Sequence, residues 1–412
     1  MADEQLRIVI LGHVDHGKST LIGRLLHDTG TLPDGKVDQV SEMSRRRGVP
    51  FEWSFVLDAL QAERDQGITI DTTQVHFRTA TRRVVVIDAP GHTEFLKNMV
   101  TGAASADAAL LLVDVGEGAV QQSRRHAFLL HLLGIRQVAV IVNKMDRVGY
   151  DPARFRAVAD EMRGYLAELG IEPAAVIPVS ARQGDNLLHR SGEAHWYGGP
   201  TVVEALDGFA PRRSAEAQAL RFPVQDVYRQ DDRRILAGRI ESGRLRVGDA
   251  LRFEPTGSVA RLAAIEAWNH AQPVLSAQAG QSVGLVLDRP LFVDRGHVAH
   301  LEAETAPVAT HRLKVRLFWL APRPLRPGAA YTLKVATAEH RVVVERLDAV
   351  IEVDDLARRP AEEVRRNEIA EIVLRSRTPV AVDRAEDLPR TGRGVLMEAG
   401  QVVGGFLVLD AE

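Results

Sequence analysis

The first half of the chain alternates short apolar runs with stretches of helical length and pattern. Buried runs that alternate with helices are typical of a mostly parallel sheet covered by helices on both faces. In such folds, ligands bind beyond the carboxyl ends of the strands. The predicted strands are residues 7–11, 84–87, 108–113, 138–142 and 176–179, and the predicted helices include residues 19–27, 122–133 and 152–169.

The pattern changes near residues 211–214. From Leu220 onward the chain shows short alternating segments separated by turns such as Glu241-Ser242-Gly243, which favour β-barrels. A second change falls near residues 303–307. We therefore predict an α/β domain at 1–213, followed by two small β-barrel domains at 214–305 and 306–412.

Composition narrows the class of protein. The chain has 412 residues, of which 45% are hydrophobic and 26% charged, a net charge of −3 and no cysteine. The absence of cysteine excludes disulfides, thiolate zinc sites and thiol catalysis. The charge gives no support for non-specific nucleic-acid binding. We see no signal peptide and no apolar run of membrane-spanning length, and we expect a cytoplasmic enzyme or switch.

A phosphate-binding loop follows the first predicted strand. Gly12 to Thr20 reads GHVDHGKST, which matches the pattern G-x-x-x-x-G-K-[ST]. Its backbone N–H groups and the following helix N-terminus favour phosphate oxygens. The Lys18 ammonium can reach the β- and γ-phosphates, and the Ser19 hydroxyl can ligate Mg²⁺. The expected nucleotide contacts are His13, Val14, Asp15, His16, Gly17, Lys18, Ser19 and Thr20.

Two further loops select the base. Asn143-Lys144-Met145-Asp146 ends a predicted strand, and an aspartate there accepts hydrogen bonds from N1–H and the 2-amino group of guanine. Adenine does not offer these donors in that arrangement. Ser180, Ala181 and Arg182 follow the next strand and would place a backbone N–H at the guanine O6 atom. The sequence therefore predicts GTP rather than ATP as the cofactor, together with Mg²⁺, and it predicts that the α/β domain at 1–213 is a P-loop GTPase domain.

Two segments have the features of nucleotide-dependent switches. In Asp88-Ala89-Pro90-Gly91-His92, the aspartate would hold Mg²⁺ through water and the Gly91 N–H would meet the γ-phosphate. We expect the His92 side chain to orient the attacking water and Thr69 to bind both Mg²⁺ and the γ-phosphate. The predicted catalytic residues are Lys18, Thr69, Gly91 and His92, and the predicted metal ligands are Ser19, Thr69 and Asp88.

These motifs together resemble those of the translational GTPase superfamily. Within it, the pattern is similar to that of the large GTPase subunit of bacterial sulfate adenylyltransferase over nearly the whole chain. The segments that carry this resemblance include residues 44–48, 62–71, 124–126, 133–136, 184–186, 196–200, 324–328 and 367–369.

The resemblance implies a function and a partner. GTP hydrolysis would help drive synthesis of adenosine 5′-phosphosulfate from ATP and sulfate by a separate small catalytic subunit, in a heterodimer or larger assembly. From the charge and the lack of a membrane-spanning run, we expect neither a membrane nor a nucleic acid as a partner.

An alternative from another class is an elongation factor that delivers aminoacyl-tRNA. His13 and His16 of the phosphate loop, together with residues 88–90 and 95–99, favour the eukaryote-type elongation factor. The slightly acidic chain and the lack of a basic stripe count against it. A GTP-binding scaffold without turnover is a third interpretation, which the complete set of predicted catalytic residues disfavours.

Overall fold

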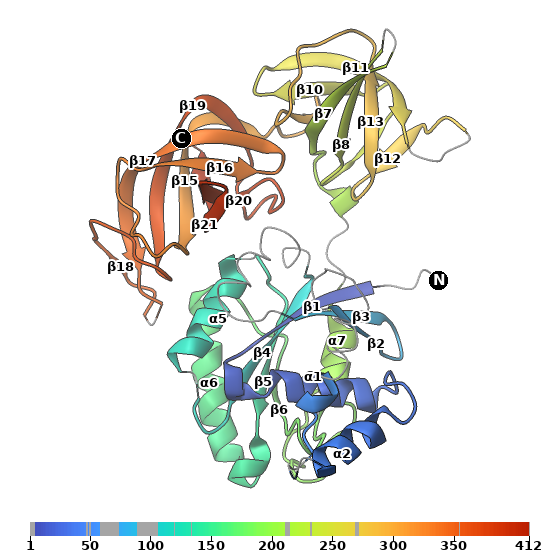
Figure 1. Cartoon of the computed structure of the whole chain (residues 1–412), viewed down its shortest axis with the longest axis vertical. Helices are drawn as coiled ribbons and strands as arrows, with labels where there is room; N and C mark the ends of the chain where they lie inside the picture. Colours follow the sequence, from blue (N-terminus) through green and yellow to red (C-terminus); the bar gives the residue numbers. More distant parts are fainter. Residues whose placement is uncertain are drawn as a thin grey trace. The chain divides into compact units, whose positions relative to one another are not determined.

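The computed structural model describes residues 5–46, 48, 51–57, 74–88, 106–118, 120–132, 134–210, 215–230, 233–267, 272–353 and 355–411. The chain divides into two compact units, Met1–Pro211 and Arg212–Glu412 (Figure 1). The first is an α/β unit and the second consists of β-sheets, which confirms the predicted fold class. The domain boundaries at 213/214 and 305/306 stay predictions.

A six-stranded sheet forms the centre of the first unit. Its spatial order is β2-β3-β1-β4-β5-β6, and only the edge strand β2 runs antiparallel to its neighbour. Each of the seven residues of β4 is buried, as expected for a strand covered on both faces. The strands are β1 (Gln5–Leu11), β2 (Gln74–Arg78), β3 (Arg83–Asp88), β4 (Ala108–Asp114), β5 (Val138–Asn143) and β6 (Ala175–Pro178).

Helices cover both faces of this sheet (Figure 1). Apolar residues of α1 and α7 join β1 in one core cluster, whereas α5 packs on β4 and α6 on β5. Local sequence sets several helix starts: Asp151 caps α6 ahead of Pro152, and Thr201 and Glu204 form a capping box for α7. The helices are α1 (Lys18–Asp28), α2 (Lys36–Arg46), α5 (Gln121–Leu132), α6 (Pro152–Glu168) and α7 (Val202–Gly208).

The first part of the second unit is a closed barrel of order β10-β11-β13-β8-β7-β14. Alternating burial along β10 shows one face turned to the barrel core. Closure removes exposed strand edges, which is the main advantage of this architecture. The barrel strands are β7 (Phe222–Gln230), β8 (Arg233–Arg239), β10 (Ala250–Glu254), β11 (Ser258–Glu266), β13 (Ser282–Leu287) and β14 (Val298–Leu301). Two short strands, β9 (Arg244–Arg246) and β12 (Ser276–Gln278), pair with each other in a separate sheet.

The second part is an antiparallel sheet of order β16-β20-β21-β15-β19-β17-β18, which an additional β16–β17 pairing closes into a second barrel. Its core is a separate apolar cluster around Trp319 and Phe406. Its strands are β15 (Val308–Trp319), β16 (Ala330–Val335), β17 (Ala338–Ile351), β18 (Arg358–Arg359), β19 (Ile369–Val382), β20 (Arg393–Glu398) and β21 (Gln401–Ala411). Within the described residues, no helix has the length and apolarity needed to cross a membrane.

Candidate nucleotide site

The phosphate loop connects β1 to α1, as predicted. Gly17 adopts a left-handed conformation with φ of 91°, and a Cβ atom there would lie 2.6 Å from the Asn143 amide nitrogen. Both constraints require glycine. Lys18 Nζ donates a hydrogen bond of 2.7 Å to the carbonyl oxygen of Gly12. The lysine is thus folded over the loop, and Ser19 and Thr20 occupy the first turn of α1 behind it.

Asn143 joins the two loops that the sequence assigns to phosphate and base. It is 2% exposed at the end of β5. Its amide nitrogen donates to the His16 carbonyl oxygen at 2.8 Å, and its amide oxygen accepts from the Ala181 N–H at 2.9 Å. One buried side chain therefore fixes the spacing between the phosphate loop and the 180–182 loop.

The base-selecting aspartate is held by the same loop. Ser180 Oγ donates to Asp146 Oδ1 at 2.8 Å, which leaves the other carboxylate oxygen for a ligand. Because the Ala181 N–H is used by Asn143, it is not the donor available for the guanine O6 atom. The next N–H, that of Arg182, has no hydrogen-bond partner among the described residues. The Arg182 N–H is therefore one backbone donor of this loop that remains for a ligand, and the O6 assignment to residues 180–182 stays a prediction.

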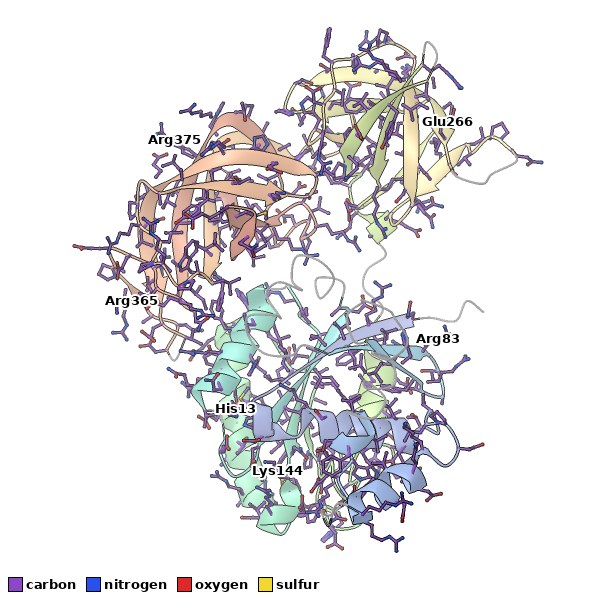
Figure 2. All side chains as sticks on the ribbon, in the orientation of Figure 1. His13, Arg83, Lys144, Glu266, Arg365 and Arg375 are labelled. Carbon is purple, nitrogen blue, oxygen red and sulfur yellow. The ribbon has the colours of Figure 1, made fainter. Side chains whose placement is uncertain are left out.

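Lys144 and Asp114 form an ion pair beside these loops. Lys144 has a left-handed φ of 65°, and its Nζ lies 2.7 Å from Asp114 Oδ2 (Figure 2 labels Lys144). The Gly116 N–H also donates to this carboxylate at 2.7 Å. Burial acts to raise the pKa of the Asp114 carboxyl, but these hydrogen bonds and the lysine charge outweigh it and lower the pKa below its usual value. Asp114 is therefore a carboxylate that holds the lysine stem in place.

Tyr150 supports the base loops from the other side. Its hydroxyl donates to Asp185 Oδ2, and its backbone carbonyl accepts from Trp196 Nε1 at 2.9 Å. Burial and the neighbouring Asp185 carboxylate raise the pKa of the Tyr150 hydroxyl far above its usual value, so it stays a neutral donor. Tyr150 therefore links the segment that follows Asp146 to Asp185 and to Trp196.

The two histidines of the phosphate loop differ in environment. His16 is fully buried, with Nδ1 at 3.1 Å from the Leu112 carbonyl and Nε2 at 3.0 Å from Glu117 Oε2. His13 lies with its ring centre 5.5 Å from that of His16, and its buried Nδ1 has no partner in the described part of the chain. Ligand atoms of His13, His16 and Glu117 lie within 4.8 Å of one another. With one oxygen ligand, this cluster does not resemble a magnesium site.

Several predicted site residues are not tested by this geometry. Thr69, Gly91 and His92 lie outside the described residues. Asp88 is described by its backbone alone: it ends β3 opposite Ile10 of β1, at the same edge of the sheet as the phosphate loop. Val14 is also described by its backbone alone, and the Asp15 side chain is exposed. Their assigned roles stay predictions.

The structure adds residues that the motif search missed. Asp114 could have been found, since it closes a predicted strand at the edge where ligands bind. Glu117, Arg24 and Trp53 had no local signal, because their roles depend on contacts between segments far apart in the sequence.

The residues fit a guanine nucleotide with Mg²⁺. The loop presents a glycine-constrained backbone, an ammonium and a serine to one end of the site. The other end presents one carboxylate oxygen of Asp146 and the N–H of Arg182. These are the donors and acceptors that a triphosphate and a guanine ring require.

Comparisons with known proteins agree with this site. The family model described as the elongation factor Tu GTP binding domain matches residues 3–212, and the one described as GTP-eEF1A C-terminal domain-like matches residues 312–408. The chain is 35% identical to elongation factor 1-alpha of Thermococcus celer, covering 100% of this chain and 99% of that protein. This chain belongs to the elongation factor Tu and elongation factor 1-alpha family of translational GTPases.

A second relative and a solved structure were also similar to this chain. Elongation factor 1-alpha of Pyrococcus abyssi (strain GE5 / Orsay) is 36% identical, over 99% of this chain and 98% of that protein. A solved structure of sup35 complexed with GDP covers 100% of this chain and 95% of its own at 25% identity, and its TM-score of 0.46 is too low to support a structural argument. Family membership confirms the predicted GTP and Mg²⁺ and the GTPase activity.

The predicted partner is wrong. The relatives that match the chain from end to end are elongation factors 1-alpha, and none of these comparisons points to a sulfate adenylyltransferase. Most segments behind that resemblance lie in the GTPase unit, where nucleotide chemistry constrains the members of the superfamily alike. The same relatives overturn the expectation against nucleic acid, which rested on the net charge of the chain and on the lack of a basic stripe in the sequence of the β domains.

Proposed function

We propose that this translational GTPase carries aminoacyl-tRNA when GTP is bound and releases it after hydrolysis. The observation that supports this function is the similarity to elongation factor 1-alpha over the full length, including the β unit at 312–408, which lies outside the matched GTP-binding domain. A protein that shared only nucleotide binding and hydrolysis with elongation factor 1-alpha would not need to be similar to it at residues 312–408.

In this proposal the base end of the site sets nucleotide identity. The Asp146 carboxylate accepts from N1–H and the 2-amino group of guanine, and the Arg182 N–H donates to O6. Asn143 holds both loops at the spacing that one nucleotide spans. The Lys144 stem lies against the base, because its ammonium is tethered by Asp114.

The phosphate end carries the chemistry. When the nucleotide binds, Lys18 exchanges its contact with the Gly12 carbonyl for phosphate oxygens. Ser19, Thr69 and Asp88 would hold Mg²⁺, which would supply positive charge next to the phosphates. His92 orients a water that attacks the γ-phosphorus, and the bond to the β–γ bridging oxygen breaks, giving GDP and phosphate. Thr69 and Gly91 then lose their γ-phosphate contact, which switches the protein.

The test is nucleotide-dependent binding of charged tRNA. We expect the full chain to protect aminoacyl-tRNA from spontaneous deacylation with a non-hydrolysable GTP analogue and to lose this protection with GDP. The Asp146→Asn variant should move the requirement from the GTP analogue to the matching xanthosine analogue. Equal protection with both nucleotide states, or none with either, would overturn the proposal.

A further inference from the structure

Residues 51–57 and helix α1 meet the base loop at one carbonyl group. The Arg182 carbonyl oxygen accepts from Arg24 of α1 at 3.0 Å and from Trp53 Nε1 at 3.2 Å. A carbonyl oxygen has two lone pairs, so both are used. No motif in the sequence assigns a role to Arg24 or Trp53.

The two donors are themselves held in place. The Arg24 guanidinium lies over the Trp53 ring, with 5.2 Å between its central carbon and the ring centre. Its Nε donates to Asp28 Oδ1 at 2.7 Å, one turn along α1. The His27 ring packs on the same indole with a centroid distance of 4.7 Å. The stacking and the ion pair between Arg24 and Asp28 restrict the rotamers of the Arg24 and Trp53 side chains. These side chains therefore lose less entropy when they donate to the Arg182 carbonyl.

Two glycines allow this close packing. A Cβ atom on Gly23 would collide with the backbone oxygen of Trp53, so α1 and the 51–57 segment touch through their backbones. A Cβ atom on Gly184 would collide with the Arg24 guanidinium, and Gly184 also has a left-handed φ of 88°. Arg24 is therefore packed against the whole turn of the base loop, and its contact with Arg182 is part of a fitted interface.

The clamped carbonyl lies next to the base-binding donor. The Arg182 N–H and C=O groups flank a single Cα atom, and Asn143 already holds the preceding N–H, that of Ala181. The loop is thus fixed on both sides of the group that we assign to guanine O6. The bonds to Arg24 and Trp53 limit rotation about the Arg182 backbone and so limit the directions in which its N–H can point.

We propose that Arg24 and Trp53 are positioning residues that clamp the Arg182 carbonyl and thereby slow the release of guanine nucleotides. This inference rests on the proposed assignment of the Arg182 N–H to O6. Trp53 belongs to residues 51–57, which precede the predicted switch residue Thr69 in the chain. The clamp therefore ties the segment leading toward that switch to the loop that reads the base.

The test compares release rates of two nucleotides from the full chain. Trp53→Phe removes the indole N–H and keeps an aromatic ring beside Arg24. We expect GDP release to accelerate about fivefold, the effect of one net hydrogen bond. Release of 6-thio-GDP should accelerate less than about twofold, because sulfur is a weak acceptor and gains little from a well-aimed N–H. Arg24→Lys replaces the planar guanidinium with an ammonium group. It should likewise accelerate the release of GDP more than the release of 6-thio-GDP.

Trp319→Phe is the matched control. It removes another indole N–H, which donates to the Arg323 carbonyl at 2.7 Å in the second unit, and should leave GDP release unchanged. If Trp53→Phe and Arg24→Lys release GDP at the wild-type rate and the chain still prefers GDP over ADP, the clamp is overturned. The assignment of the base site would then still stand. Equal acceleration for GDP and 6-thio-GDP would also overturn it, since general loosening is not positioning. A wild-type chain without preference for GDP would overturn the base site and the clamp together.

Discussion

At the scale of single residues, Asp146 is the group whose chemistry decides the nucleotide. Its carboxylate is fixed by the Ser180 hydroxyl and presents one oxygen to the base. Asp146→Asn replaces an acceptor with a donor, which suits the C2 oxygen of xanthine and leaves the guanine amino group facing another donor. We expect affinity for GDP to fall at least about a hundredfold and affinity for XDP to rise above it. Titration with fluorescent GDP and XDP measures both.

The control for this change is Asp151→Asn. Asp151 lies in the same segment, but its carboxylate caps α6 by accepting from the Ala153 N–H at 2.8 Å. Asparagine caps helices as well as aspartate does, so this variant should keep the preference for GDP. Unaltered GDP selectivity in Asp146→Asn would show that another group reads the base.

Asn143 is the residue on which the spacing of the site depends. Asn143→Ala leaves the His16 carbonyl and the Ala181 N–H without their partner, and buried polar groups left unsatisfied cost about 1–3 kcal/mol each. Because both groups belong to nucleotide-binding loops, we expect GDP release to accelerate by at least about tenfold. Stopped-flow fluorescence with a labelled GDP measures the rate.

Asn186→Ala provides a comparison of equal chemistry. Asn186 is also buried and also makes two hydrogen bonds, to the Pro178 carbonyl and from the Ser191 N–H. Its loss should destabilise the first unit and change GDP release much less. If the two variants release GDP equally fast, the link between the loops contributes only to general stability.

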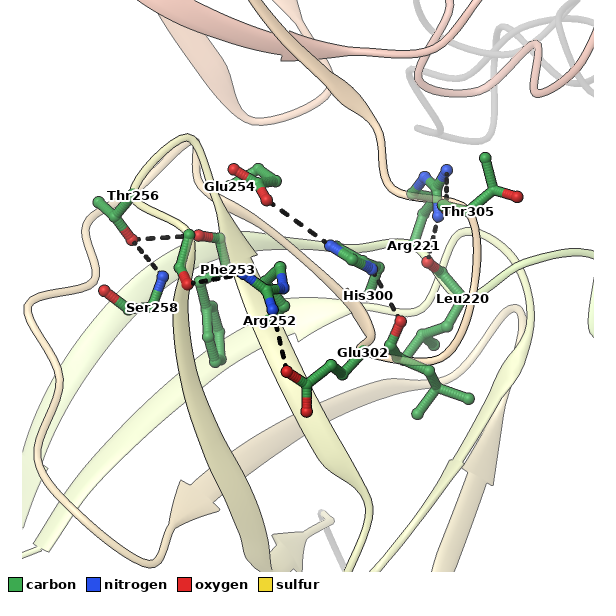
Figure 3. A network of polar contacts seen from close by, with 12 residues as sticks. Leu220, Arg221, Arg252, Phe253, Glu254, Thr256, Ser258, His300, Glu302 and Thr305 are labelled. Carbon is green, nitrogen blue, oxygen red and sulfur yellow. Dashed lines mark hydrogen bonds and ion pairs between the residues drawn. The ribbon is translucent and has the colours of Figure 1, made fainter.

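At the scale of secondary-structure elements, a buried ion pair joins the residue before β7 in one barrel to the residue after β19 in the other. Arg221 precedes β7 and is 1% exposed; its guanidinium binds both oxygens of Asp383 at 2.8 and 2.7 Å. Arg221 also donates to the Leu220 and Thr305 carbonyls (Figure 3), and Thr391 Oγ1 donates to Asp383. The sequence around Arg221 gave no sign of this contact, since its partner lies 162 residues away.

Breaking this pair should destabilise the second unit strongly. Asp383→Asn leaves a buried guanidinium without a counter-charge, and such losses cost about 3–5 kcal/mol. Chemical denaturation followed by the fluorescence of Trp319, in the second unit, measures the change. Glu241→Gln breaks the more exposed pair with Arg390, formed at 2.6 Å, and should cost less than about 1 kcal/mol. Similar losses in both variants would mean that burial does not set the strength of the Arg221 pair.

The elements show how far sequence patterns reach. Strands β1, β3, β4, β5 and β6 and helices α1, α5 and α6 form within one or two residues of their predicted bounds, because buried apolar runs and helical periodicity are local signals. Helix α2 was missed because its sequence, KVDQVSEMSRR, is mostly polar. The edge strand β2, QVHFR, was missed although its polar and apolar residues alternate, because it spans only five residues and pairs on one side only. Barrel registers could not be predicted, since pairing between distant strands has no local signature.

The candidate site shows the same limit. The motifs identified the loops, and the structure brings Lys18, Asn143, Asp146 and Ser180 to one edge of the sheet as the strand order requires. Which N–H remains for the guanine O6 atom could not be predicted. That depends on Asn143 using the Ala181 N–H, a contact across 38 residues. The predicted partner subunit was wrong, because several members of the superfamily share the nucleotide-binding motifs. These motifs therefore do not distinguish one member's partner from another's.

At the scale of the whole molecule, the two compact units have separate apolar cores. One cluster includes Ile8 and Leu21 of the first unit, and two others, around Phe253 and Trp319, lie in the second. The nucleotide site lies in the first unit alone. We therefore expect two calorimetric unfolding transitions, of which only one responds to GDP with Mg²⁺.

The size of this response follows from mass action. At a GDP concentration of 100 times Kd the first unit gains about 2.7 kcal/mol, which raises the midpoint of a unit of this size by roughly 5–10 °C. The second transition should not move. In Asp146→Asn the shift should disappear with GDP and reappear with XDP, which ties it to the base site rather than to phosphate alone. A GDP-dependent shift of the second transition as well would show instead that nucleotide binding also stabilises the barrels.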